Sequence, residues 1–415
     1  MISHLILTSF LGAILSVSLI HADEKPLVGV IDLFLAGTTE LEGVPDSKTR
    51  YGQFREPGIV VTKSGRVVVV TQARDHSKWS DRSGQDLAVR WSDDHGETWS
   101  KTVRAAEHGN FSICPQSVVY DGVKDMLHVL YTVHQWDFSI GNKGYKALRK
   151  EGKVERDNCF QYHIKSTDGG QTWTKPRDIS HMMKSDKAVV VFGSGRGIQI
   201  QHGKHKGRLV ISGGTRNPKW GNNAFYSDDH GETWTVSEYV PKSKTEKIGA
   251  RNEAKIAELS DGTLIMHVRA VPCRAKSYSL DSGETWQPYQ QETAVEMASC
   301  NGALISHFDK KSGKTYLIAA GPAGPGRMNG IVWISEDGGK TWPHRRKLIP
   351  RTIAYASLAT LQDGSIAMVY ESEVYHGGSY KHLRMKKFTI KEILGHKDPM
   401  PTDKFDPNEG TYENP

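Results

Sequence analysis

The stretch Ser92-Asp93-Asp94-His95-Gly96-Glu97-Thr98-Trp99 decides how this 415-residue chain folds, because its pattern Ser-x-Asp-x-Gly-x-Thr-Trp occurs five times. The pattern is that of a β-hairpin turn: the aspartate side chain can accept backbone N–H bonds inside the turn, and the glycine can take positive φ. Threonine and tryptophan then begin the next strand. Five copies with identical internal spacing indicate a repeated hairpin; the other four begin at Ser166, Ser227, Ser279 and Ser335.

The intervals between these copies predict the architecture. The copies follow one another at roughly fifty to seventy-five residues, which leaves room for about four short strands each. The apolar run 58–70 contains the turn signal Ser64-Gly65, so we expect two strands there. The sequence therefore predicts an all-β fold, a six-bladed β-propeller over roughly residues 27–395. We expect strands from both chain ends, including the run 27–36, to close one blade and protect its edges.

The first 22 residues predict export. They contain no Asp, Glu, Lys or Arg, residues 5–20 are mostly apolar, and the charged Asp23-Glu24-Lys25 follows. This pattern is typical of a secretory signal peptide at 1–22; an uncleaved anchor is the alternative, although the apolar run is short for a membrane span. We therefore expect a secreted or periplasmic protein with a propeller domain at 23–397 and no membrane span in the mature chain. The stretch 398–415, rich in Pro, Asp and Asn, is predicted to be a C-terminal tail.

Charge and cysteine content limit the classes of ligand, disulfide and metal site that this chain could have. The formal net charge is +7, which suits an anionic substrate, and no basic run with interleaved aromatic residues indicates nucleic-acid binding. Four cysteines allow three full disulfide pairings, and the most local of these joins Cys114 to Cys159 and Cys273 to Cys300. Free buried thiols are the alternative. Their spacing fits no zinc motif. No metal or other cofactor is expected.

Several polar residues stand within or at the end of strand-like runs. For any one of them a solvated or paired surface charge, or a core tyrosine, is the ordinary explanation. In a propeller, however, the strand ends of all blades converge near the central axis, so residues that are remote in sequence can meet there. The residues at such positions are Arg55, Glu253, Arg269, Arg327, Tyr355 and Glu371.

These positions carry a resemblance to a known family. Phe54-Arg55-Glu56-Pro57 is similar to a Phe-Arg-Ile-Pro segment of the sialidase (neuraminidase) superfamily, in particular of its bacterial exo-α-sialidases, and the five repeats resemble that family's Asp boxes. The resemblance covers nearly the whole mature chain and departs from the family pattern at Glu56, where isoleucine is usual. Further segments that agree in order and spacing are Asn252-Glu253-Ala254-Lys255 followed by Arg269, Arg327-Met328-Asn329, Ala354-Tyr355-Ala356-Ser357-Leu358, and Tyr370-Glu371.

The resemblance implies a site for a carboxylate. A sialic acid carries a carboxylate on its anomeric carbon, and Arg55, Arg269 and Arg327 would hold that group through charge-assisted hydrogen bonds. Three converging cations repel one another in the absence of an anion. Glu371 would offset part of that cost by pairing with Arg55.

The resemblance also implies the reacting groups. Tyr355 would be the nucleophile, because a neutral phenol avoids the repulsion that a carboxylate nucleophile would meet beside an anionic sugar. Glu253 would accept the phenol proton, since an unperturbed tyrosine has a pKa of about 10. The acid/base aspartate would come from the loop between the first arginine and the first Asp box. There Asp81 has the best spacing, and Asp75 and Asp86 are the alternatives.

The predicted function is that of a secreted exo-α-sialidase. It would hydrolyse terminal sialic acids from glycoconjugates with retention of configuration, through a tyrosyl-enzyme intermediate, so sialylated glycans are the expected partners. Two alternatives stay open. One is a related propeller that acts on another nonulosonic acid or forms transfer or anhydro products, and the other is a non-catalytic sugar-binding propeller.

Overall fold

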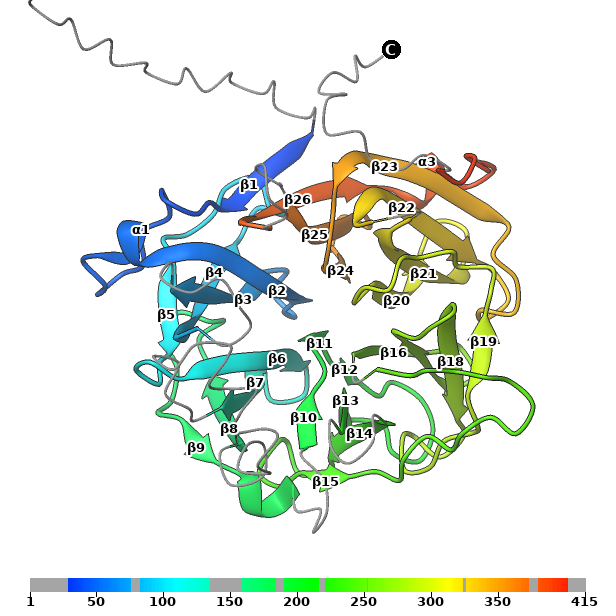
Figure 1. Ribbon diagram of the computed structural model, residues 1–415, viewed down its shortest axis with the longest axis horizontal. Coiled ribbons are helices and arrows are strands. Elements are labelled where there is room, and N and C mark those ends of the chain that lie inside the picture. The colour runs from blue at the N-terminus through cyan, green and yellow to red at the C-terminus, as the bar shows by residue number, and fades with distance from the viewer. Residues whose placement is uncertain are drawn as a thin grey trace, which may run out of the picture.

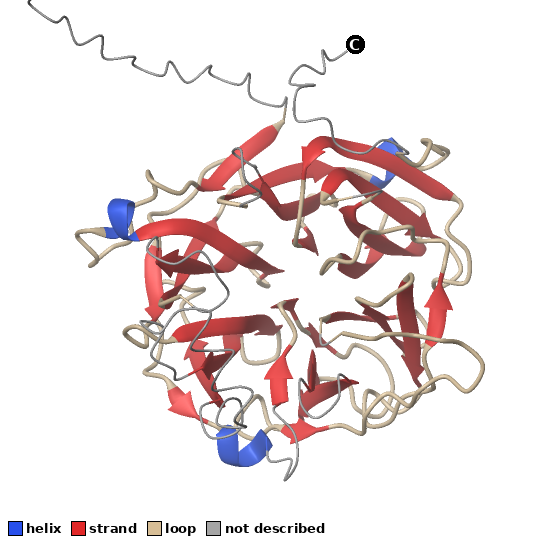
Figure 2. Ribbon diagram, viewed as in Figure 1, coloured by secondary structure: helices blue, strands red, loops and turns tan. Residues whose placement is uncertain are grey.

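Six β-sheets surround a common axis in the part of the chain that the structure describes (Figure 1). This computed structural model describes residues 29–75, 83–134, 159–183, 190–215, 221–251, 253–323, 326–372 and 380–401. Each sheet extends from an inner strand near the axis to an outer strand at the rim, and strands make up nearly all of the regular structure (Figure 2). The predicted all-β, six-bladed propeller is confirmed.

The first five blades follow one another along the chain. Blade 1 consists of β2 (Tyr51–Val61), β3 (Val67–Asp75), β4 (Gln85–Ser92) and β5 (Val103–Ala106). Blade 2 consists of β6 (Ser112–Asp121), β7 (Met126–His134), β8 (Cys159–Ser166) and β9 (Arg177–Asp178), with β11 (Gly195–Arg196) added parallel to β6. Blade 3 consists of β10 (Val190–Phe192), β12 (Ile198–Gln199), β13 (Leu209–Thr215), β14 (Gly221–Ser227) and β15 (Thr235–Val236). Blade 4 consists of β16 (Ala254–Glu258), β17 (Leu264–Val268), β18 (Arg274–Ser279) and β19 (Gln290–Glu292). Blade 5 consists of β20 (Ala303–Asp309), β21 (Lys314–Pro322), β22 (Met328–Ser335) and β23 (His344–Thr352).

Blade 6 is closed by the two ends of the propeller. It contains β24 (Ala356–Thr360), β25 (Ile366–Ser372), β26 (His382–Phe388) and, at its outer edge, β1 (Val30–Phe34). β1 pairs antiparallel with β26, and Arg384 Nε meets Asp32 Oδ1 at 2.7 Å across this pair. The predicted closure by strands from both chain ends is therefore confirmed, as is the division of the run 58–70 into two strands, β2 and β3.

Each eight-residue repeat forms the same turn. In the first, Asp94 accepts the backbone N–H of Thr98 at 2.9 Å and also the Thr98 hydroxyl. Gly96, at φ +88°, donates its N–H to Ser92 Oγ at 2.8 Å, and Trp99 Nε1 donates to the carbonyl of Gly96 at 3.0 Å. The other four repeats make the same bonds among their Ser, Asp, Gly and Thr residues. Because every partner lies within eight residues, the turn can be read from sequence.

Protonation of these aspartates is expected to weaken the turns. The hydrogen bonds from Thr98 hold the pKa of Asp94 well below its ordinary value of 3.8. Because this pKa is depressed in the folded chain, the carboxylate stabilises the fold above about pH 4, and that contribution is lost as the pH falls toward the folded value. An Asp94→Asn variant should therefore have a lower urea midpoint near neutral pH and a shallower decrease of that midpoint between about pH 5 and 2.

The matched control for this prediction is Asp46→Asn. Asp46 precedes α1 (Ser47–Arg50) and makes no side-chain capping bond to it, so its replacement should leave the urea midpoint close to that of the wild type. A pH dependence of Asp94→Asn equal to that of the wild type would contradict the prediction.

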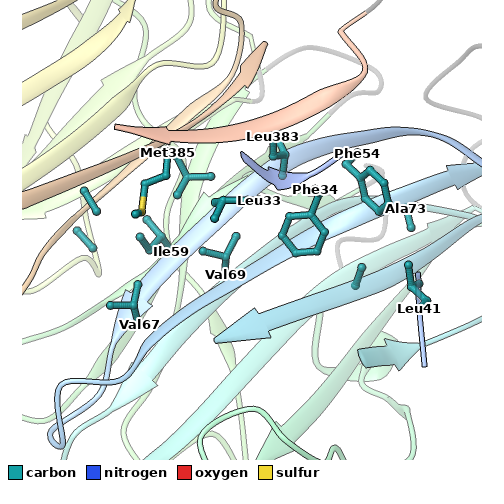
Figure 3. Packing of buried hydrophobic residues seen from close by; sticks show 14 of the residues in the cluster. Leu33, Phe34, Leu41, Phe54, Ile59, Val67, Val69, Ala73, Leu383 and Met385 are labelled. Atoms are coloured by element: carbon teal, nitrogen blue, oxygen red, sulfur yellow. The ribbon is translucent and has the colours of Figure 1, made fainter. Parts of the chain in front are cut away.

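A buried apolar cluster joins blade 6 to blade 1 (Figure 3). Phe34 from β1, Val69 from β3 and Met385 from β26 are fully buried in it. Burying a side chain of this size stabilises the fold by ~1.5–3 kcal/mol. Phe54 of β2 belongs to the same cluster, so this packing fixes the inner strand that carries Arg55.

The structure describes all four cysteines but only part of the predicted terminal segments. The four cysteines, all within the described residues, form no disulfide with one another, and Cys114, Cys159 and Cys300 are buried. The predicted signal peptide at 1–22 and residues 402–415 of the predicted tail lie outside the described residues, whereas Asp398 accepts the N–H of Lys347 at 2.9 Å. None of the helices in the described ranges has the length and apolar character needed to cross a membrane.

Candidate active site

Two hairpins bring four of the predicted residues to the inner ends of blades 4 and 6. Glu253 directly precedes β16 and Arg269 directly follows β17, and the N–H of Arg269 donates to the carbonyl of Glu253 at 2.9 Å. Tyr355 directly precedes β24, and the N–H of Glu371 in β25 donates to its carbonyl at 2.9 Å. The two residues of each pair therefore lie opposite each other, one position beyond the paired strands of an antiparallel hairpin. The two hairpins have the same length, so both pairs are 16 positions apart in sequence.

The hydroxyl of Tyr355, beside blade 6, forms hydrogen bonds with two residues of blade 4. It donates to Glu253 Oε1 at 2.6 Å and accepts from Arg269 Nη1 at 3.1 Å. The same nitrogen lies 2.9 Å from both carboxylate oxygens of Glu253. The phenol thus stands between a carboxylate that can take its proton and a cation that can stabilise its oxygen.

Arg55 and Arg327 lie against the ring of the same tyrosine. Their guanidinium carbons are 5.5 and 5.3 Å from the centroid of the Tyr355 ring. They are 5.2 and 5.3 Å from the centroid of the Tyr380 ring, so both cations are within cation–π distance of two aromatic faces. Arg55 also forms an ion pair with the fully buried Glu371, with Nε and Oε1 2.7 Å apart. Three arginines from three blades therefore converge on one tyrosine.

Burial and charge set the protonation of this cluster. Burial, reinforced by the negative charge of Glu253, raises the pKa of Tyr355 well above its ordinary value of 10. Burial alone would lower the pKa of Arg269, but the acidic groups around it, with Glu253 the strongest of them, together outweigh burial and the pKa rises. A phenol that is so hard to ionise can act as a nucleophile only with a base in direct contact, and Glu253 is in that position.

Glu56, the departure from the family segment, has its carboxylate among buried partners. It lies at a β-bulge of β2 with φ +58°, a conformation that is rare for a residue other than glycine. Its carboxylate meets Arg74 Nη2 at 3.2 Å, accepts from Cys114 Sγ at 3.4 Å and accepts the hydroxyl of Ser194. Its backbone N–H donates at 2.8 Å to Glu371, on the oxygen that pairs with Arg55.

The three candidates for the acid/base aspartate fall in different places. Asp81 lies outside the described residues. Asp86 is fully buried in β4, where it accepts the hydroxyl of Tyr51 and lies 3.6 Å from Arg104; burial raises its pKa, and its carboxylate has no access to solvent. Asp75 is partly exposed at the end of β3.

Tyr380 is the residue of this cluster that sequence reasoning missed. It stands two positions before β26 and packs against the group formed by Cys300, Ala354 and Tyr355. Its partners Arg55 and Arg327 are remote in sequence, and it belongs to no repeat or recognised segment, so no sequence signal marked it. Within the ranges that the structure describes, no group of three or more His, Cys, Asp or Glu side chains is placed to hold a metal ion.

Comparison with protein families agrees with the fold and the repeats. Residues 117–368 match the family described as BNR repeat-like domain, and residues 90–101, which contain the first eight-residue repeat, match the BNR/Asp-box repeat. The chain belongs to this BNR repeat-like family. The match extends from blade 2 into blade 6, so it covers most of the propeller.

The relatives of this chain include sialidases and an anhydrosialidase. A sialidase of Bacteroides fragilis is 29% identical over 356 residues, which are 82% of this chain and 63% of that protein. An anhydrosialidase of Macrobdella decora is 26% identical over 352 residues, 74% of this chain and 45% of that protein, so the chain spans about half to two thirds of the length of these relatives. The solved structure of Hadza microbial sialidase Hz136 covers 83% of this chain and 68% of its own, at a TM-score of 0.70 and 23% identity. The resemblance to the sialidase superfamily is confirmed.

Proposed function

We propose that this protein is an exo-α-sialidase that releases terminal sialic acids from glycoconjugates with retention of configuration. One observation carries the proposal: the Tyr355 hydroxyl is shared by Glu253 and Arg269, while Arg55 and Arg327 lie over the Tyr355 ring. The similarity to named sialidases supports the same activity. The predicted signal peptide supports export, so the proposed place of action is outside the cytoplasm, in the periplasm or the medium.

The proposed substrate carboxylate binds to the three arginines. A planar guanidinium can donate two parallel hydrogen bonds to a carboxylate, and three of them define both its position and its orientation. Glu371 keeps Arg55 in place through their ion pair, and Tyr380 contacts both Arg55 and Arg327 through its ring face. An anion between these cations relieves their mutual repulsion, which favours an anionic sugar over a neutral one.

The proposed reaction has two steps. In the first, Tyr355 Oη attacks the anomeric carbon while its proton passes to Glu253, and the bond to the aglycone oxygen breaks as Asp81, our proposed acid, protonates that oxygen. In the second, Asp81 takes a proton from a water molecule that attacks the anomeric carbon. The bond to Tyr355 breaks and the phenol regains its proton from Glu253. Two inversions at one carbon give net retention.

The similarity to an anhydrosialidase supports a second candidate. Its first step is the same, but in its second step a hydroxyl group of the same sugar, in place of water, attacks the anomeric carbon and displaces Tyr355. A single experiment separates the candidates. The purified chain is incubated with a sialylated oligosaccharide, and its products are followed by NMR and mass spectrometry. Free sialic acid that appears first as the α-anomer supports the retaining hydrolase, and a product lighter by one water supports the anhydro reaction. No product from a folded protein that still binds the sugar would overturn both and support a sugar-binding propeller.

A further inference from the structure

Three charged side chains lie buried beside the proposed site without a part in the proposed reaction. Lys255 of β16, Glu56 of β2 and Arg74 of β3 are exposed by 2, 5 and 1%. Buried charges are costly unless they are paired and hydrogen-bonded, so the contacts that hold them call for an explanation.

Ser194, which directly precedes β11, connects two of these charges. Lys255 Nζ donates to the carbonyl of Ser194, and Asn301 Nδ2 lies 3.5 Å from the same oxygen. The hydroxyl of Ser194 donates to Glu56 Oε2. β2, β11 and β16 approach the axis from three different blades (Figure 1), so Ser194 joins a cation of blade 4 to an anion of blade 1.

The backbone at Gly195 is shaped for this contact. Gly195 has φ +112°, and a Cβ atom there would lie 2.4 Å from Lys255 Nζ. Any side chain at this position would therefore collide with the amino group. Glycine at this position is what allows Lys255 to reach the carbonyl of Ser194.

Both ends of this connection lead to proposed site residues. At one end, Glu56 N–H donates at 2.8 Å to the Glu371 oxygen that pairs with Arg55. The φ of +58° at Glu56 is disfavoured, and its anchored carboxylate holds the bulge in that conformation. At the other end, Lys255 stands two positions after Glu253 at the start of β16, so anchoring Lys255 also fixes the segment that carries Glu253.

We propose that Lys255, Ser194 and Glu56 form a buried link that positions Arg55 and Glu253, an inference that rests on the proposed function. The three are positioning residues, because in the part of the chain that the structure describes none of them makes a hydrogen bond to the hydroxyl of Tyr355 or to the carboxylate of Glu253. The link depends on the positive charge of Lys255. Without it, the negative charge of Glu56 is less well balanced, because the hydrogen bonds through Ser194 no longer connect it to a cation. The bulge that orients Arg55 is then less firmly held.

The charge of Lys255 makes the proposal testable through the pH dependence of kcat/KM, which would not change if Lys255 only filled space in the core. The titratable groups whose charges act on its amino group are Glu253 on its own chain segment, Glu56 from β2, Arg274 from β18 and Cys300 from the segment before β20. Burial lowers the pKa of Lys255 to about 8, whereas burial raises the pKa of Cys300 to about 11. The link therefore loses its cation as the pH rises through about 8.

The first test measures kcat/KM against pH with a fluorogenic aryl α-sialoside, whose activated leaving group needs no protonation. Above about pH 8 we expect the wild-type value to fall as Lys255 loses its proton, and to level off about tenfold lower, at the value of an enzyme without that charge. In Lys255→Met we expect kcat/KM to be about tenfold lower near pH 6 and to lack this fall, because the titrating group is gone.

The second test measures the link without substrate. Urea midpoints of the wild type, Glu56→Leu, Lys255→Met and the double variant form a thermodynamic cycle. Each single substitution leaves a buried charge with a weaker partner and should lower the midpoint, whereas the double variant should lower it by less than the sum of the two.

Glycine variants keep the proposal testable if a core substitution prevents folding. Gly195→Ala should lower kcat/KM near pH 6 by about tenfold, because its Cβ displaces the amino group of Lys255. Gly207→Ala is the matched control: Gly207 also has positive φ, +99°, but among the described residues no atom lies within 4 Å of the point where its Cβ would stand, so its activity should stay at the wild-type level.

The outcomes are decisive in each direction. A non-additive cycle together with the altered pH profile supports the link. A non-additive cycle in a protein that releases no sialic acid supports the link and rejects the proposed function. Additive midpoints, or an alkaline fall that persists in Lys255→Met, would overturn the link even if the wild type is an active sialidase.

Discussion

In a Tyr355→Phe variant, hydrolysis of a fluorogenic α-sialoside is expected to fall on the order of 10³-fold or more in kcat. Phenylalanine keeps the ring that Arg55 and Arg327 contact, so the carboxylate site should persist and KM should change little. The variant removes only the hydroxyl that is hydrogen-bonded to Glu253 and Arg269. The loss should therefore appear in kcat, as expected for a group that forms a bond to the substrate in the reaction.

Tyr370→Phe is the matched control. Tyr370 is another buried tyrosine, 1% exposed in the neighbouring strand β25, and its hydroxyl has no hydrogen-bond partner within the described ranges. Its replacement should leave kcat near the wild-type value. If Tyr355→Phe, folded by the criterion of its urea midpoint, kept a rate within a few-fold of the wild type, a tyrosyl intermediate at this position would be ruled out.

A Glu253→Gln variant is expected to lose between about 10² and 10⁴-fold in kcat. The amide keeps the shape of the carboxylate but cannot accept the phenol proton, and burial already holds the pKa of Tyr355 well above 10. The substitution also replaces the charge that lies 2.9 Å from Arg269 Nη1, so this arginine becomes freer to repel its neighbours or to bind an anion.

Measurement of kcat and KM separately distinguishes these two consequences. A kcat that falls with KM unchanged or lowered supports Glu253 as the base. Glu258→Gln, at the far end of the strand β16 that Glu253 precedes, is the control, because the carboxylate of Glu258 accepts the backbone N–H of Gln201 and should not affect the reaction. A loss expressed in KM alone would assign Glu253 to holding Arg269, and the base would have to be sought elsewhere.

The fold could be predicted from sequence because its decisive chemistry is local. Each Ser-x-Asp-x-Gly-x-Thr-Trp turn closes its hydrogen bonds within eight residues, as Asp94 and Thr98 do. The pairing of Glu253 with Arg269 and of Tyr355 with Glu371 was also within reach, since each pair follows from the register of its own hairpin. Such information is contained in short segments and does not depend on how the blades are placed.

The parts that sequence did not reveal depend on contacts between blades. Tyr380 acts on arginines of blades 1 and 5, and nothing in its own neighbourhood marks it. The direction of the Glu56 side chain depends on a bulge and on Ser194, 138 positions away. The resemblance located Glu56 as a departure, but only the packing of several blades shows which groups receive its charge. Asp81 stays a prediction, because it lies outside the described residues.

The pairing of β1 with β26 has a consequence for biosynthesis. Asp32 meets a partner, Arg384, that is synthesised 352 residues later. At ~5–20 residues per second, the ribosome needs roughly 20–70 s to supply that partner. Throughout this interval the nascent chain carries a strand whose edge has nothing to pair with, and such an edge invites pairing with a neighbouring polypeptide. The opening residues of the propeller are thus the segment with the longest need for chaperone protection during translation.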